Sequence, residues 1–172
     1  MLARTGRPNG LAVDRHGNIW VAESGEVPAL LRMNMDGEVE VFLTECNGEK
    51  FLFPNDLAIG PEGDIYMTDS GILFEEFAPG GKLRPDWATC PMDGRVYKIN
   101  PKTRKVTKID SGLKFTNGIA FGPDQNLYAN EMIPAIVWRY EWKDGQIVSG
   151  RQYYGTAADP DSPAEMKLTD GQ

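Results

Sequence analysis

The segments NGLAVDRHGNIWVAE (residues 9–23), NDLAIGPEGDIYMTD (55–69) and NGIAFGPDQNLYANE (117–131) align with one another without a gap. Each begins with Asn, continues with an apolar run, passes through a polar turn and ends a second apolar run with an acidic residue. Two short apolar runs around such a turn predict a β-hairpin. Because the apolar positions are nearly consecutive, both faces of each hairpin are expected to be buried.

A second pair of strands is predicted after each hairpin, where apolar and charged residues alternate as on a half-exposed sheet. These outer pairs occupy residues 30–34 with 38–43, 95–99 with 105–109, and 135–141 with 146–154. Repeated four-stranded units are typical of a β-propeller. We therefore predict an all-β propeller of four-stranded antiparallel blades at residues 7–52, 53–114 and 115–167. The alternative is a β-sandwich with accidental internal similarity.

A single propeller domain is expected over residues 1–172, incomplete at both ends. Residues 168–172 (LTDGQ) resemble the start of a further blade, with Asp170 where the next Asn is due. Three blades do not close a ring, because propellers have roughly four to eight. We therefore expect the chain to be part of a longer propeller, and by itself to be poorly stable or to self-associate.

Composition narrows the class of partner. The formal net charge is -7, which disfavours a phosphate-binding surface, so no nucleic acid partner is expected. No apolar run is long enough to span a membrane and the N-terminal residues do not resemble a signal peptide, so we expect no membrane partner and a cytoplasmic location. Cys46 and Cys90 lack metal-site spacing and are expected to be free thiols.

The hairpin geometry gathers polar side chains at one end of the propeller. Asn9, Asn55 and Asn117 each begin an inner strand, so they are expected to meet at the channel mouth, where Asp170 would join them. Amide and carboxylate oxygens suit a hard cation such as calcium, which takes about 6–8 oxygen ligands. The alternative is that each Asn bonds only to its local backbone.

The acids that end the three segments, Glu23, Asp69 and Glu131, lie at the same end. They are expected either to orient the Asn ring by hydrogen bonds or to anchor the loops. The single histidine, His16, falls in a turn at the opposite end, which excludes a Ser–His–Asp triad from this chain. Two possibilities are left for this chain: metal-assisted chemistry that uses carboxylates, or no catalysis.

The longest connection runs over Gly71–Gly94 and emerges at the Asn end. Loops of this length in compact domains often act as lids over a site. We expect this loop to overhang the channel mouth; the alternative is that it packs on a neighbouring blade.

The motifs FPNDLAIGPEGDIYMTDSG (53–71), DGRVYKIN (93–100) and TNGIAFGPDQNLYANE (116–131) closely resemble the senescence-marker protein/gluconolactonase family, and the resemblance extends over nearly the whole chain. Members of that family are six-bladed propellers that hold one divalent cation, usually calcium, at the top of the central channel. Many hydrolyse lactones.

The resemblance implies a site in this chain. Asn117 and Asp170 match the family's metal ligands, and Asn55 matches a further residue that lines the metal and substrate site. Asp170 also matches the proposed catalytic base, whereas the family's first-blade Glu ligand has no counterpart here. Phe53 stands where sugar-lactonase members carry Arg, which implies a less polar substrate at that position.

The expected function is therefore metal-dependent hydrolysis of a small-molecule lactone, with one divalent cation, expected to be calcium, polarising the carbonyl. Two alternatives stay open. One is a propeller without catalysis that binds a protein or a small ligand, and the other is a relative of strictosidine synthase that shares the fold without the hydrolysis.

Overall fold

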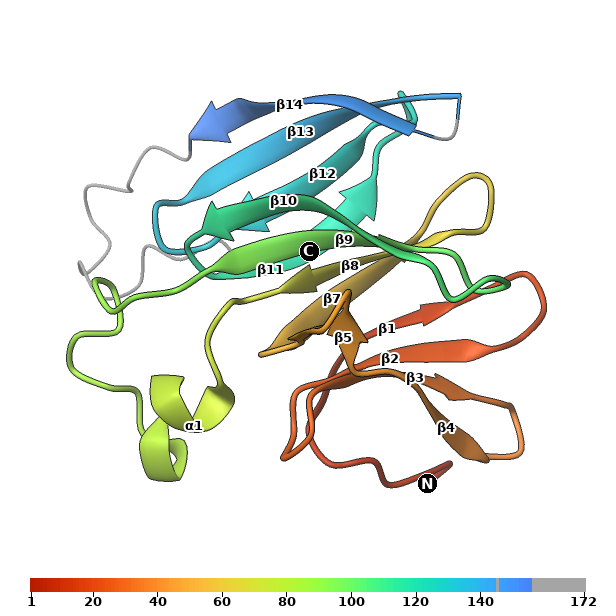
Figure 1. Cartoon of the computed structure of the whole chain (residues 1–172), viewed down its shortest axis with the longest axis horizontal. Coiled ribbons are helices and arrows are strands. Elements are labelled where there is room, and N and C mark those ends of the chain that lie inside the picture. The colour runs from red at the N-terminus through yellow and green to blue at the C-terminus, as the bar shows by residue number, and fades with distance from the viewer. Residues whose placement is uncertain (145, 156–172) are drawn as a thin grey trace.

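The computed structural model describes residues 1–144 and 146–155, which form three four-stranded antiparallel sheets that follow one another in chain order (Figure 1). The first sheet contains β1 (Pro8–Val13), β2 (Ile19–Glu23), β3 (Ala29–Met33) and β4 (Val39–Leu43). The second contains β7 (Pro54–Ile59), β8 (Ile65–Asp69), β9 (Gly94–Ile99) and β10 (Val106–Leu113). The third contains β11 (Thr116–Phe121), β12 (Leu127–Glu131), β13 (Ile136–Lys143) and β14 (Gln146–Gly155). A small ribbon of β5 (Glu45–Cys46) and β6 (Glu49–Lys50) joins the first two.

The sheet order confirms the predicted β-propeller blades. In each sheet the strands pair in sequence order, and the inner strand β7 contacts the inner strands β1 and β11 of the two adjacent blades. Every residue of β8 is buried, as the continuous apolar run predicted. The expectation is wrong for the first hairpin, because no residue of β1 is buried and Leu11 and Val13 are exposed. A two-sheet sandwich is wrong, because each repeat forms its own four-stranded sheet.

Apolar layers between successive blades hold the fold together. Trp20 of β2 meets Phe42 of β4 edge to face, with ring centroids 4.9 Å apart, and both pack on the second blade. Between the second and third blades, Tyr66 and Phe121 repeat the same geometry at 4.9 Å. Buried aromatic rings therefore pack the blades face to face. Their edge-to-face pairs stabilise the fold beyond the effect of the buried apolar area alone.

Each inner strand carries a β-bulge at the Asn that begins its repeat. The ladder passes from Pro8↔Glu23 to Leu11↔Val21 in the first blade, so two residues of β1 oppose one of β2. The same shift occurs between Pro54 and Leu57 and between Thr116 and Ile119. Bulges redirect side chains at strand ends. Here the repeat places the same irregularity, and therefore an Asn in the same setting, in all three blades.

The loop between β8 and β9 carries the short helix α1 (Phe74–Phe77) and the 3-10 turn η1 (Pro79–Gly81). Figure 1 shows it beyond the strand ends, opposite the turns of the inner hairpins. Gly71 begins the loop with φ +80°, and a Cβ there would lie 2.1 Å from the backbone of Asp93, so only glycine lets the loop close at its base.

Cys46 and Cys90 are both free and buried. Within the described residues, no helix has the length and apolar character needed to cross a bilayer.

Candidate functional site

The predicted Asn residues differ in their surroundings. Asn55 is only 4% exposed and its Nδ2 donates to Ser70 Oγ at 2.9 Å. Asn117 is half-buried and its Nδ2 donates to Met132 Sδ at 3.5 Å. Asn9 is exposed. Asn55 and Asn117, in adjacent blades, are therefore at least partly buried and have side-chain hydrogen bonds that orient their amides, whereas Asn9 is exposed.

A hydrogen-bond network ties Asn55 and Asn117 to the same seam between the second and third blades. Ser70, which accepts from Asn55, donates to the carbonyl of Thr116 at 2.9 Å. The hydroxyl of Thr68 donates to the carbonyl of Asn117. The two Asn residues are therefore held at fixed positions by side chains of one blade that bind the backbone of the next.

Asp56 is part of this seam, although it was not among the residues predicted from the sequence. One of its oxygens accepts from the backbone N–H of Ile119 at 3.0 Å, so the carboxylate joins β7 to β11. On its other side, Gly10 packs so closely that a Cβ would lie 2.4 Å from Asp56 Oδ1. The signal was present in the repeat, because the other two segments have Gly where this one has Asp.

The acids that end the repeats anchor backbone. Asp69 accepts from the N–H groups of Leu52, Phe53 and Gly71 at 2.8–2.9 Å, and burial raises its pKa while these bonds oppose the rise. Glu23 and Glu131 similarly accept from the backbone of Arg7 and Lys114. Of the two expectations, loop anchoring describes all three.

The donor set at this end fits a hard cation in part. Among the described residues, the hydrogen bonds of the Asn55 and Asn117 side chains are donated by Nδ2, and none is accepted by their amide oxygens. Those two oxygens suit a calcium-like ion. In the same described part, no cluster of three His, Cys, Asp or Glu side chains could hold a metal. Asp170, the predicted carboxylate ligand and base, lies outside the described residues.

An apolar cap covers this end of the blades, and we call it the cap cluster. Its buried members are Phe53, Ile72, Phe77, Ala78, Cys90, Phe115 and Met132. The loop supplies α1, whose Phe77 stacks on Phe115 with centroids 4.5 Å apart and whose Phe74 meets Phe53 at 5.8 Å. The Arg7 guanidinium lies 3.3 Å from the centroid of Phe74. The loop thus lies at the Asn end and also packs on the neighbouring blades.

Phe53, the predicted substrate contact, lies inside this cap cluster. It is 7% exposed and meets the rings of Phe74 and Phe115 edge to face. The residues two places before each repeat Asn are Arg7, Phe53 and Phe115, and all three contact the loop. Contact of Phe53 with substrate stays a prediction.

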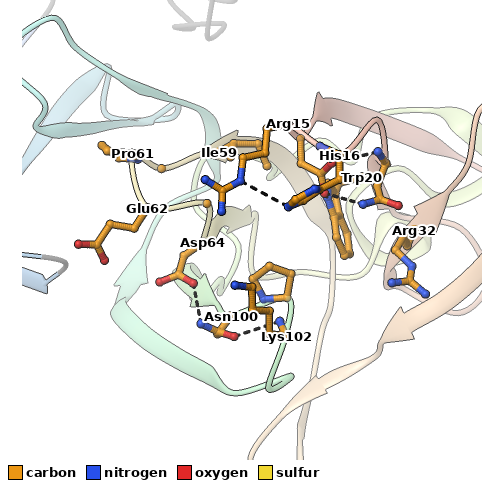
Figure 2. A pocket seen from close by; sticks show the side chains of 15 residues that line it. Arg15, His16, Trp20, Arg32, Ile59, Pro61, Glu62, Asp64, Asn100 and Lys102 are labelled. Carbon is orange, nitrogen blue, oxygen red and sulfur yellow. Dashed lines mark hydrogen bonds between the residues drawn. The ribbon is translucent and has the colours of Figure 1, made fainter.

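A separate cavity of about 430 Å³ lies at the opposite end, between the hairpin turns of the first two blades (Figure 2). His16 and Arg15 line it, as the sequence placed His16 away from the Asn end. Burial raises the pKa of Asp14 there, but bonds from Asn18, Trp20 and backbone N–H groups outweigh it and hold the pKa below its usual value. None of the predicted site residues lines this cavity.

Comparison with known proteins places this geometry in context. A solved gluconolactonase from Xanthomonas campestris aligns with a TM-score of 0.68 and 27% identity over 95% of this chain and 51% of its own. A gluconolactonase from Zymomonas mobilis is 29% identical over 83% of this chain and 39% of its own. Strictosidine synthase-like 3 from Arabidopsis thaliana is 32% identical over 72% of this chain and 30% of its own.

The chain spans about half or less of the length of these relatives. Residues 26–171, which include both bulges with Asn55 and Asn117, match the family described as the SMP-30/Gluconolactonase/LRE-like region. The chain therefore belongs to the SMP-30/gluconolactonase/LRE-like family.

Proposed function

We propose that this propeller hydrolyses a lactone at the end that carries Asn55 and Asn117, with one divalent cation, which we take to be calcium. The observation that carries the proposal is the pair of amide oxygens that accept no hydrogen bond from the described residues, each held by its own Nδ2 bond. The similarity to gluconolactonases supports the reaction class.

The residues have distinct proposed roles. Asn55 and Asn117 would hold the cation together with Asp170, and Ser70, Thr68 and Asp56 keep β7 and β11 in register beneath them. When bound, a divalent cation supplies Lewis acidity to a carbonyl and lowers the pKa of water. Asp170 is proposed to take the proton from the attacking water. The cap cluster would exclude bulk solvent from the reacting ester.

A second candidate follows from the similarity to strictosidine synthase-like proteins, which points to a family branch named for a synthase. In that case the same end of the propeller would bind a small molecule without opening a lactone. A protein that binds without catalysis would still need the cap cluster beside its ligand, but it would not need the two amide oxygens as cation ligands.

The first test measures acid release from a panel of lactones by the full-length protein, before and after treatment with a chelator and after return of calcium. Asn117→Ala and Asp170→Asn are expected to lower kcat/KM about 10- to 100-fold or more and to weaken calcium binding measured by calorimetry, because the first removes an oxygen ligand and the second removes the negative charge of a carboxylate ligand. Asn9→Ala is the matched control, since Asn9 has the same place in the repeat but is exposed, and it should leave both values unchanged.

Each result has a separate meaning. Turnover and calcium affinity that survive both substitutions would remove the site from these residues. Activity that persists in chelator would remove the cation from the reaction and leave the lactonase proposal standing. Binding of lactones without acid release would favour the synthase-like or binding propeller.

A further inference from the structure

The cavity of about 430 Å³ at the turn end of the blades is formed by three hairpin turns (Figure 2). Arg15 and His16 belong to the turn between β1 and β2, Glu62 to the turn between β7 and β8, and Lys102 to the turn between β9 and β10. Cavities that hold small organic ligands have volumes of roughly 300–1,000 Å³. The cavity therefore has room for such a ligand, at the end of the blades opposite to the proposed lactone site.

The carboxylate of Asp14, in the wall of this cavity, has all its acceptor sites occupied. Its Oδ1 accepts from the backbone N–H groups of His16 and Asn18 at 2.8 and 3.0 Å. Its Oδ2 accepts from Asn18 Nδ2 at 2.8 Å and from Trp20 Nε1 at 2.9 Å. A carboxylate accepts about four hydrogen bonds. Asp14 therefore holds the turn together and offers no acceptor to a ligand.

The two other acids of the cavity are either compensated or turned away. Asp64 Oδ1 accepts from Asn100 Nδ2 at 2.9 Å, and Asp64 Oδ2 forms an ion pair with Lys98 Nζ at 3.1 Å. Glu62 is exposed, and Figure 2 shows its side chain directed away from the other labelled residues. The negative charge inside the cavity is thus already met by bonds within the protein.

Two cationic side chains of the cavity lack such compensation. Arg15 uses its Nε to donate to His16 Nε2 at 3.4 Å, which leaves the two terminal nitrogens of the guanidinium for a ligand. Within the part of the chain that the structure describes, neither Arg15 nor Lys102 has an ion-pair partner, whereas Arg32 is paired with Glu40 at 2.5 Å. The charges of the cavity that remain available are therefore positive.

The remaining wall of the cavity is apolar. Trp20 and Ile59 contribute to it from strands β2 and β7, and Pro61 and Pro101 contribute from two of the turns. An organic ligand can therefore place an apolar body against these side chains while its charged group meets the cations at the turns.

We propose that this cavity binds a small organic anion, a carboxylate or a phosphate ester on an apolar body, through the Arg15 guanidinium and the Lys102 ammonium. The terminal nitrogens of a guanidinium donate two parallel hydrogen bonds that match two oxygens of such a group, and an ammonium adds a compact positive charge. The proposal is independent of lactone hydrolysis, because no residue assigned to that reaction lines the cavity.

The test titrates the full-length protein by calorimetry with benzoate and with phenyl phosphate, in a buffer free of carboxylate and phosphate. Benzamide, which has the shape of benzoate without its charge, is the control ligand. At least one of the anions is expected to bind with a dissociation constant on the order of 1 mM or lower, and benzamide at least about tenfold more weakly. The anion that binds more tightly shows whether the cavity prefers carboxylate or phosphate.

Arg15→Gln and Lys102→Gln should each weaken binding of that anion by roughly tenfold, because each removes a charged donor from the cavity. Lys105→Gln is the matched control, since Lys105 is also exposed in the connection between β9 and β10 but does not line the cavity. It should change the dissociation constant by less than about twofold, because salt screens charges at a distance. Thermal melting verifies that the three variants keep the fold.

Three outcomes would overturn the inference. Benzamide that binds as tightly as benzoate would exclude an anion as the preferred ligand. Anion binding that is unchanged in both Arg15→Gln and Lys102→Gln, or equally weakened in Lys105→Gln, would remove the site from this cavity. No binding of either anion at about tenfold above the expected dissociation constant would do the same. None of these measurements involves lactone turnover, so a failure here leaves the proposed function untouched.

Discussion

Single residues at the candidate site divide into those that would meet a ligand and those that hold backbone in place. Asn55 and Asn117 have amide oxygens that accept nothing from the described residues, whereas Asp56 and Asp69 use their oxygens on backbone N–H groups. An acid beside a candidate site is therefore not by itself evidence for a ligand. What decides its role is how many of its lone pairs the backbone already occupies.

Asp69 shows what the anchoring acids contribute. Asp69→Asn is expected to lower the free energy of unfolding by about 1–3 kcal/mol, because the amide NH₂ would face a backbone N–H that now donates to a carboxylate oxygen. Urea denaturation followed by tryptophan fluorescence measures the change. Asp36→Asn in an exposed turn is the control and should stay within about 0.5 kcal/mol of the parent. An equal effect of both substitutions would contradict the anchoring role.

At the scale of elements, the loop with α1 is the feature that joins the blades at the Asn end. It belongs to the second blade, yet its rings contact Arg7 of the segment before β1 and Phe115 of the segment before β11. Three successive blades are thus contacted by one loop. We expect its docking to depend on Phe77, which is buried, more than on the exposed positions of the same loop.

Phe77→Ala should free the loop locally, because truncation of a buried Phe typically costs about 3–5 kcal/mol. Tryptic cleavage after Lys82 is expected to become at least about tenfold faster, while the blades keep their strand content by circular dichroism. Leu73→Ala is the control, since Leu73 is exposed at the start of the loop. Global loss of strand signal at the same temperature as cleavage would mean that the loop is an integral part of the core.

At the scale of the whole molecule, the first blade presents an apolar face away from the second. The ladder aligns Leu11, Val21, Leu31 and Val41 in one row across this sheet. Leu11, Val13 and Val41 are 59%, 62% and 60% exposed. In the middle of the face, Val21 and Leu31 are buried and the N-terminal segment packs there through Ala3.

The 172-residue chain alone is expected to self-associate through that face, because contiguous exposed apolar surface favours association. Sedimentation velocity over a range of concentrations should show this, and the double substitution Val13→Lys with Val41→Lys should shift the distribution toward monomer. Met35→Lys is the control, because Met35 is as exposed but lies in a turn outside the strands. A stable monomer in the parent chain would contradict the expectation.

The repeat in the sequence was sufficient for the blades, their strand order and the common end of the Asn residues, since hairpin turns and alternating burial are local properties of neighbouring residues. It did not reveal Asp56 as a link between β7 and β11, because that contact joins residues far apart in the chain.

Nor could the sequence distinguish Asn9 from Asn55 and Asn117, which share one motif but differ in burial. Only the tertiary structure decided this, because a side chain's solvation and partners depend on the loop and blade packed against it. The same reason explains the cap cluster: Phe53, Phe77 and Phe115 become one surface only when three segments of the chain meet at one end of the propeller.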